Sequence, residues 1–196
     1  MKSTQSKNLL IFTSVSSVWA VIMGLIGPFY VVYVERLSGG MDKLGIAFAI
    51  MVLLQAATSY LAGSFSDRLG RKPFLFLIAY IDATVLFLYT VIDQTYQLYL
   101  LQGMLGVTNG VAGTIQTSLL GDLTTEGFRG KPIGRFNAIV SLCSAAGLSA
   151  GGFFVKIFGL KALFYLASGG VALSTVLLLF IKETRRQPGK DHSPAV

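Results

Sequence analysis

One acidic side chain lies where acids are rare, inside an apolar stretch of the chain. Asp82 stands about halfway along residues 73–92, and no basic residue lies at the centre of any apolar segment. Burying a carboxylate in hydrocarbon costs roughly 3 kcal/mol or more, so such a residue is by default a functional group. Without a cation beside it, we expect Asp82 to be protonated at rest and able to carry a proton. A protonated Asp82 that only hydrogen-bonds to a neighbouring helix is an equally good explanation.

A second set of charges is concentrated in GSFSDRLGRKP, residues 63–73, between two apolar stretches. Gly63 permits the close approach of a neighbouring helix, and Gly70 permits the positive φ angle of a tight reversal. Asp67 has no such local role, because it opposes the surrounding positive charge. It is best matched by an arginine or by the positive N-terminal end of another helix. The bases of this stretch are Arg68, Arg71 and Lys72.

Polar and small residues recur every three or four positions in the apolar stretch 97–120. This stripe consists of Gln102, Gly106, Asn109, Gly113 and Gln116. A weaker stripe in residues 9–34 consists of Thr13, Ser17, Gly24 and Pro28, with Tyr30 and Tyr33 beyond it. A polar stripe on an otherwise apolar helix either lines a cavity or bonds to a neighbouring helix, and the spacing alone does not separate the two.

The composition is that of a membrane protein. The 196 residues are 53% hydrophobic and only 13% charged, with 22 glycines, and a soluble domain is more polar than this. The single cysteine, Cys143, and the single histidine, His192, provide no disulfide, zinc site or histidine-based triad. The sequence has no phosphate-binding loop or nucleophile–base pair, so we expect neither an enzyme nor a cofactor. The net charge of +7 does not indicate nucleic-acid binding, because no basic patch alternates with aromatic residues.

Six apolar segments are long enough to cross a bilayer as helices. Strands are excluded because the segments do not alternate polar and apolar residues, and backbone groups in lipid must bond within their own segment. We therefore expect an all-α fold with a six-helix transmembrane domain at 9–181, preceded by residues 1–8 and followed by a polar, disordered tail at 182–196. The six segments are 9–34, 44–64, 73–92, 97–120, 133–155 and 162–181.

The basic residues predict the orientation in the membrane. If the chain crosses six times, the side with both termini carries twelve of the sixteen Lys and Arg residues, and the other side carries four. The positive-inside rule then places both termini in the cytoplasm, with the chain as a multi-pass protein of the cell (inner) membrane.

Residues 9–92 and 97–181 resemble each other at an offset of 89 positions. The matches include Gly45 with Gly134, Gly63 with Gly152, and Gly70 with Gly159. Chance matching of glycine-rich helices is one explanation, and duplication of a three-helix unit is the other. Because three is odd, a second unit would enter the membrane in the opposite direction. Inverted three-plus-three repeats are a transporter architecture, in which the repeats rock about a central site.

The stretch 63–73 resembles the signature loop between the second and third helices of the major facilitator superfamily. Six positions match: Gly63, Asp67, Arg68, Gly70, Arg71 and Lys72. The stretch 121–139 resembles the family's fourth loop, with matches at Asp122, Glu126, Arg129, Gly130 and Gly134. The resemblance covers the whole chain, which is similar to the amino-terminal six-helix half of a twelve-helix member of the drug-efflux branch. Tyr99 stands where the family often has an arginine, and Leu148 where it often has a proline; both departures argue against proton-driven drug antiport.

The resemblance implies two sites. The first is a conformational latch in which Asp67 caps a helix of the other half, with Arg68 and Asp122 as a charge relay and Arg129 in the matching loop. The alternative is a turn that only sets the topology. The second site is a substrate cavity beside the first and fourth helices. Its candidate residues are Ser17, Gly24, Gln102, Asn109, Gly113 and Gln116.

Six helices do not enclose a cavity that opens alternately to two sides, so we expect a partner. Two parallel copies of the chain would supply both halves, with the second and fifth helices at the contact. The fifth helix offers small residues for helix packing or for this contact between two chains, Gly147, Gly151 and Gly152. The alternatives are a different six-helix half, or a membrane scaffold or regulatory subunit that transports nothing. The expected function is secondary active transport of a small-molecule substrate across the lipid bilayer by alternating access, with Asp82 as the candidate for proton coupling.

Overall fold

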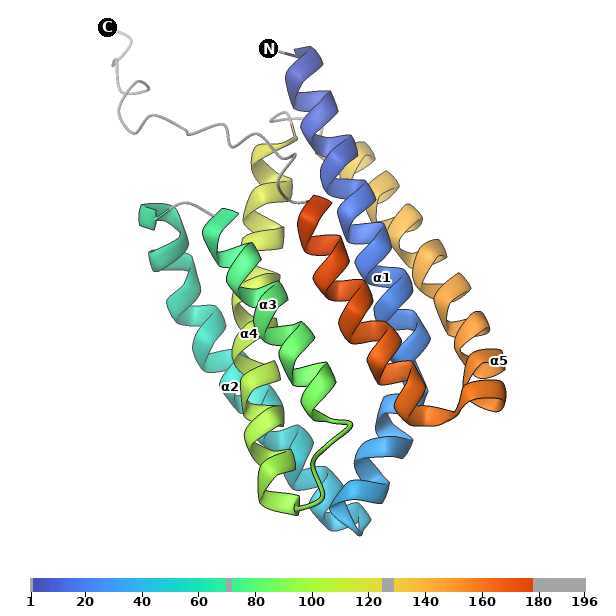
Figure 1. Ribbon diagram of the computed structural model, residues 1–196. Helices are drawn as coiled ribbons and strands as arrows, with labels where there is room; N and C mark the ends of the chain where they lie inside the picture. The colour runs from blue at the N-terminus through green and yellow to red at the C-terminus, as the bar shows by residue number, and fades with distance from the viewer. Residues whose placement is uncertain (1, 70–71, 125–128, 178–196) are drawn as a thin grey trace, which may run out of the picture.

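The computed structural model describes the backbone of residues 2–69, 72–124 and 129–177, and the side chains of residues 7–63, 74–124 and 129–175. Within these ranges the chain is helical apart from short connections (Figure 1). The expectation of an all-α fold is therefore confirmed for the described residues. The helices are α1 (Lys2–Ser38), α2 (Met41–Leu69), α3 (Lys72–Leu88), α4 (Thr95–Asp122) and α5 (Gly130–Leu177).

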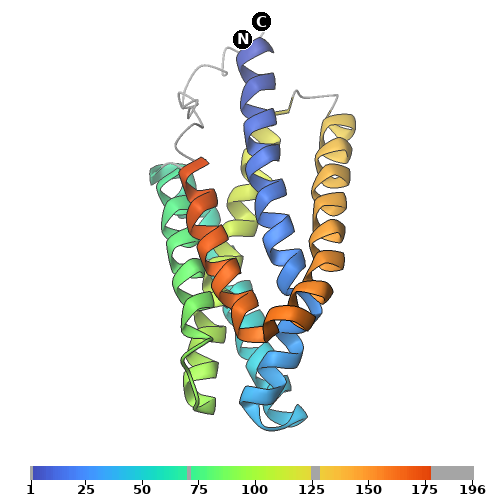
Figure 2. The ribbon, with the colours of Figure 1, turned by 45° about the vertical axis from the view of Figure 1, so that its right-hand side comes forward.

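Two of these helices contain a break at a glycine. In α1 the break is at Gly27, where φ is 20° and ψ is −117°, directly before Pro28. In α5 it is at Gly159, where φ is 82° and ψ is 170°, a positive φ that glycine adopts without steric cost. The chain reverses at Gly159, so residues 130–158 and 160–177 form two separate helical segments (Figure 2). These segments correspond to the fifth and sixth apolar segments of the sequence.

The helix ends gather at two ends of the bundle. The start of α1, the end of α4 and the start of α5 lie at one end, the N-terminal end (Figures 1 and 2). The α1–α2 turn at Gly39, the α3–α4 connection and Gly159 lie at the opposite end, the far end. Consequently α1, α3 and residues 130–158 run toward the far end, and α2, α4 and residues 160–177 run back.

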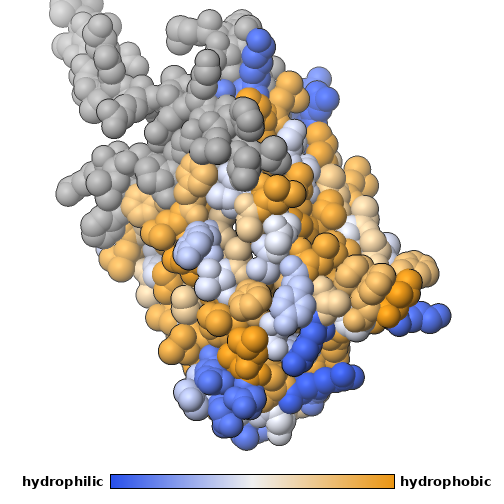
Figure 3. Space-filling model, viewed as in Figure 1, coloured by the Kyte–Doolittle hydropathy of each residue, from blue (hydrophilic) through white to orange (hydrophobic). Residues whose placement is uncertain are grey.

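The exterior between the two ends is largely apolar. Figure 3 shows hydrophobic residues over the middle of the visible face and hydrophilic residues gathered toward the ends. Exposed large side chains include Leu53, Tyr60, Leu142 and Phe153. Because such a surface is favoured in lipid rather than in water, it fits a membrane protein.

Three helices are long and apolar enough to cross a bilayer by length and composition. They cover Lys7–Ser38, Met41–Gly63 and Gly130–Thr175, and α3 contributes the shorter apolar helix Phe74–Leu88. α4 has 28 residues, which is long enough to span, but its polar stripe lowers its mean hydropathy. Gln102 and Thr108 of this stripe are buried inside the bundle, and the six-helix transmembrane domain stays a prediction.

Glycines bring helices into backbone contact in two pairs. α1 packs along residues 130–158, where a side chain at Gly24 would collide with the Ser144 carbonyl oxygen. α2 packs along α4 in the same manner, because a side chain at Gly106 would collide with the Met51 carbonyl oxygen. Within each pair the two helices run in the same direction. Small residues at such contacts let two backbones approach closely, which strengthens packing where the surroundings are apolar.

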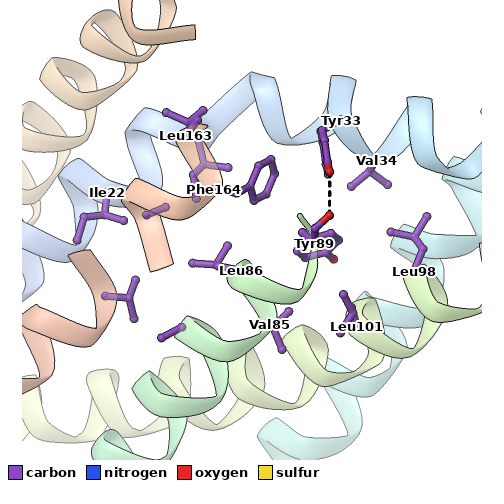
Figure 4. Packing of buried hydrophobic residues seen from close by; sticks show 14 of the residues in the cluster. Ile22, Tyr33, Val34, Val85, Leu86, Tyr89, Leu98, Leu101, Leu163 and Phe164 are labelled. Atoms are coloured by element: carbon purple, nitrogen blue, oxygen red, sulfur yellow. Dashed lines mark hydrogen bonds between the residues drawn. The ribbon is translucent and has the colours of Figure 1, made fainter. Parts of the chain in front are cut away.

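The main apolar core lies toward the far end of the bundle. α3 packs against α4 and α5, and Ser168 Oγ of α5 donates a hydrogen bond to the Ala83 carbonyl oxygen of α3 at 2.7 Å. Side chains of α1, α3, α4 and residues 160–177 meet there (Figure 4). The core residues labelled in Figure 4 include Val34, Val85, Leu86, Leu98, Leu101, Leu163 and Phe164.

Candidate functional site

Most of the expected latch lies outside the described side chains. This holds for Asp67, Arg68, Gly70, Arg71 and Lys72. Gly63 is described on α2, where a Cβ would lie 4.0 Å from the Thr114 methyl carbon of α4. Asp122 is the last residue of α4 and Arg129 directly precedes α5, and both are exposed at the N-terminal end. The latch therefore stays a prediction.

The six expected cavity residues do not share one surface. Gly24 is pressed against α5, and Gln102 is 0% exposed within the bundle, so neither lines an open cavity in this structure. Asn109 is half-buried on α4. The half-buried Ser17 has a hydroxyl oxygen without a hydrogen-bond partner among the described residues. The two exposed members are Gly113 and Gln116.

Gln102 belongs instead to a buried hydrogen-bonded group, the tyrosine cluster, which comprises Tyr30, Tyr33, Tyr89 and Gln102. The Tyr30 hydroxyl donates to Gln102 Oε1 at 2.8 Å and lies 3.0 Å from the Tyr89 hydroxyl. The Tyr33 hydroxyl donates to the Tyr89 carbonyl oxygen at 2.8 Å (Figure 4). The cluster thus connects α1 to α3 and α4. The ring of Phe164 packs against all three tyrosines.

Tyr89 is the member of this cluster that the sequence does not single out. It follows the last residue of α3 and is 0% exposed. A tyrosine at the end of an apolar helix is usually read as an anchor at the membrane interface, so composition favours exposure. Only the tertiary structure, which brings the end of α3 against α1, shows that the Tyr89 hydroxyl has a buried partner in the Tyr30 hydroxyl.

Asp82 faces the interior of the bundle, between α3 and α4. It is 4% exposed, and the Thr108 side chain of α4 lies beside its carboxyl group. The Thr108 hydroxyl donates a hydrogen bond to the Leu105 carbonyl oxygen of its own helix at 3.1 Å. Asp82 Oδ1 has no hydrogen-bond partner within the described part of the chain. Asp82 is buried whereas Gly113 and Gln116 are exposed, and no group of three or more described His, Cys, Asp or Glu side chains is arranged to hold a metal ion.

The glycines expected at a contact between two chains are partly occupied within this one. A side chain at Gly147 would collide with the Val21 carbonyl oxygen of α1, and one at Gly151 with the Leu25 carbonyl oxygen. Gly152 is exposed. Gly147 and Gly151 therefore make helix contacts within the chain, against α1, and a contact with a second copy stays a prediction.

Polar side chains are exposed where three helices meet at the N-terminal end. Phe12 of α1, Leu120 of α4 and Phe136 of α5 form a buried cluster, and the two phenyl rings stack with centroids 5.5 Å apart. Exposed polar residues lie within five positions of a cluster member on each helix. They are Ser14, Gln116, Thr117, Asn137 and Ser141. We call this group the polar face. The Ser14 and Thr117 hydroxyls donate to the Leu10 and Gly113 carbonyl oxygens of their own helices, so the Gln116 and Asn137 amides are its groups better matched to water or a polar ligand than to lipid.

Comparison with known proteins shows extensive similarity to one family. The model of the Major Facilitator Superfamily matches residues 10–195. The uncharacterized MFS-type transporter YitZ of Bacillus subtilis (strain 168) is 28% identical over 79% of this chain and 94% of its own length. The multidrug resistance protein MdtG of Citrobacter koseri is 29% identical over 84% of this chain and 41% of its own length. The class B tetracycline resistance protein of Escherichia coli is 28% identical over 85% and 42%, respectively.

The chain thus spans nearly all of YitZ and less than half the length of the two resistance proteins. The matched region includes every described helix except the first turns of α1. The all-helical fold and the apolar exterior agree with this match. The chain belongs to the Major Facilitator Superfamily, as a multi-pass membrane protein of the transporter type that matches the family's amino-terminal half.

Proposed function

We propose that the chain transports a small solute by alternating access, as one of two six-helix halves of a secondary active transporter. The observation that carries this proposal is the relation between residues 9–92 and 97–181. Each of the three helices in the first set runs opposite to the helix at the same place in the second set (Figures 1 and 2). The first helix of each set also packs on the second helix of the other set: α1 packs on residues 130–158, and α4 packs on α2. Both features are expected of inverted three-helix repeats.

The substrate cavity is best placed at the polar face. Gly113 and Gln116 are exposed on α4, and Ser17 lies on α1 one turn beyond the exposed Ser14. Neutral hydroxyl and amide groups of this kind orient a ligand by hydrogen bonds. A second six-helix half, either another copy of this chain or a different one, would cover the face and complete the cavity.

Reconstitution tests the transport proposal. The chain, alone and together with candidate second halves, would be placed in proteoliposomes and supplied with tetracycline and a panel of lipophilic drugs, with and without a pH gradient. We expect uptake or efflux that a Gln116→Ala, Asn137→Ala double variant reduces. Transport of none of these compounds in any combination would favour a scaffold or regulatory role instead.

We further propose Asp82 as the group that couples transport to protons. Its burial and its Oδ1 atom, which has no hydrogen-bond partner among the described residues, support this role, because such a carboxyl group gains and loses a proton with the packing around it. Asp82→Asn should reduce gradient-driven transport at unchanged expression, whereas Asp93→Asn, at an exposed acid of the α3–α4 connection, should not. An unaltered pH dependence in Asp82→Asn would reject the role.

The latch and the orientation are proposals of the same kind. Asp67, with Arg68 and Asp122, would hold the N-terminal end closed against the second half, and Asp67→Asn should shift the transporter between its two open forms. Both termini are proposed to lie in the cytoplasm, at the inner membrane of the cell. Reporter fusions at each terminus test this, since a terminus reported outside would reverse the orientation.

A further inference from the structure

Two lysines flank the reversal of α5 at Gly159. Lys156 precedes the reversal, Lys161 follows it, and both side chains are exposed. Neither lysine has a hydrogen bond or an ion pair with any residue that the structure describes. The sequence offers no local partner either, because it has no acid from residue 127 to residue 182. No described acid therefore neutralises these two positive charges.

The helix dipoles do not account for the pair. Lys156 lies in the last turn of residues 130–158, where a positive charge is favoured. Lys161 lies in the first turn of residues 160–177, where a positive charge is disfavoured. Capping of a helix end can therefore explain one lysine but not both, and an anion from outside the described chain would compensate the two together.

Two other bases at the far end have different surroundings. Arg36 and Lys43 each directly follow an acid in the sequence, and they lie on either side of the α1–α2 turn. That turn extends beyond the reversal at Gly159, which lies at about the same level of the bundle as the end of α3 (Figures 1 and 2). Lys156 and Lys161 therefore stand at the edge of the apolar exterior, whereas Arg36 and Lys43 stand farther out.

Exposed apolar side chains lie one helical turn from each lysine. Phe153 lies one turn before Lys156, and Tyr165 lies one turn after Lys161, so each pair shares a helix face. The ring of Phe158, between the two lysines, is exposed as well. Figure 3 shows a hydrophilic group projecting beyond hydrophobic ones at the edge of the molecule where Figure 1 shows the reversal. A lysine in this setting lays its methylene stem along apolar surface while its ammonium group reaches the headgroup layer.

We propose that the reversal at Gly159 binds the headgroup of an anionic phospholipid through Lys156 and Lys161, with the acyl chains lying along Phe153 and Tyr165. The negative phosphodiester meets two ammonium groups that have no acid of their own, and the exposed rings cover the start of the chains. A zwitterionic headgroup brings its own cation and gains less from the two lysines. This site is independent of the proposed transport, because it lies on the lipid-facing side of the bundle.

Lipid titration tests the site. The full chain in detergent micelles would be titrated with phosphatidylglycerol and, separately, with phosphatidylcholine of the same acyl chains, and native mass spectrometry would count the lipids retained. The double variant Lys156→Gln, Lys161→Gln should raise the apparent Kd for phosphatidylglycerol about thirtyfold, the effect of losing two lysines beside an anionic headgroup. Its Kd for phosphatidylcholine should not change. The double variant Lys156→Arg, Lys161→Arg keeps both charges and should bind phosphatidylglycerol as the unmodified chain does.

A matched variant separates this site from general attraction between charges. Arg36→Gln, Lys43→Gln removes two exposed bases from the same end and should leave the Kd for phosphatidylglycerol unchanged. Equal weakening in this variant and in Lys156→Gln, Lys161→Gln overturns the inference, and so does equal affinity of the unmodified chain for the two lipids.

Glycerol phosphate distinguishes a lipid site from a site for soluble phosphate. It carries the anionic group without acyl chains, so it should not displace phosphatidylglycerol, and displacement would overturn the assignment to a lipid. Circular dichroism checks that the helices of every variant are intact. Because lipid binding requires neither a substrate nor a second half, failure of this site and failure of the transport proposal give different results.

Discussion

The two parts of α1 are joined in one helix but are fixed by different means. Before Gly27, the backbone of α1 touches the backbone of α5 at glycines, and α2 and α4 touch in the same way. After Gly27, side-chain hydroxyls and aromatic rings make the contacts, to α3, α4 and residues 160–177, and the rings of Phe29 and Tyr30 also reach Gly151 of α5 and Phe48 of α2. Glycine contacts exclude alternative positions because any displacement causes a collision or leaves a gap. Hydroxyl bonds are directional and individually weak.

The largest loss of stability is expected when a large side chain replaces a glycine at the contact between α1 and α5. In Gly24→Leu, a large side chain would collide with the Ser144 carbonyl and the Leu148 backbone amide. We expect the free energy of unfolding in micelles to fall by about 3 kcal/mol. This loss is measured by adding increasing amounts of a denaturing detergent and monitoring the unfolding by circular dichroism. A loss no larger than that of a surface substitution would remove the distinction between the two parts.

A smaller substitution tests whether glycine is equally necessary at the contact between α2 and α4. Gly106→Ala places one methyl group against the Met51 carbonyl oxygen of α2. The collision should outweigh the higher helix propensity of alanine and lower the free energy of unfolding by about 2 kcal/mol. The same denaturation experiment reports it. If Gly106→Ala is stabilising, the α2–α4 contact is looser than the α1–α5 contact and the two pairs are not equivalent.

The contact between Tyr33 and Tyr89, in the part of α1 after Gly27, is expected to contribute less stability than the glycine contacts. Tyr33→Phe removes the hydrogen bond to the Tyr89 carbonyl while keeping the ring on Phe164. We expect a loss of about 1 kcal/mol in the free energy of unfolding. Tyr165→Phe serves as the matched control because its ring is exposed. A loss as large as that of Gly24→Leu would show that residues 28–38 of α1 are held as firmly as the part before Gly27.

The smallest effect is expected at a glycine without a close neighbour. No atom lies within 4 Å of the position that a Cβ would occupy at Gly113, and the residue is exposed on α4. Gly113→Ala should therefore stabilise the helix by about 0.5 kcal/mol, since alanine favours helix more than glycine does. A clear destabilisation would mean that Gly113 is already covered, for example by a second chain present in the sample, and size-exclusion chromatography would detect that chain.

Much of the helix pattern can be predicted from the sequence. The boundary expected between residues 155 and 162 contains the observed break at Gly159, because Lys156 and Lys161 interrupt the apolar run. The first span was expected to end at residue 34 but continues to Ser38. Apolar composition does not report helix ends, and the helix continues until Gly39 adopts a positive φ of 74°.

The contents of the candidate site could be predicted less well. The stripe on α4 was expected to form one surface, yet Gly106 contacts α2, Gln102 bonds to Tyr30, and Gln116 is exposed. Spacing shows which residues share a helix face, but it does not show which neighbour that face meets. The pairing of α1 with α5 and of α2 with α4 is a tertiary property that is absent from the periodicity of either helix.

The reversal at Gly159 has a consequence for how the chain enters a membrane. Only one residue there departs from helical geometry, so the two segments that it joins have no slack between them. A nascent hairpin of this type cannot leave one arm in water while the other crosses, and both arms must be inserted together. Lengthening this turn, for instance by adding a short flexible linker after Gly159, would uncouple the arms and would be expected to yield molecules inserted in mixed topologies.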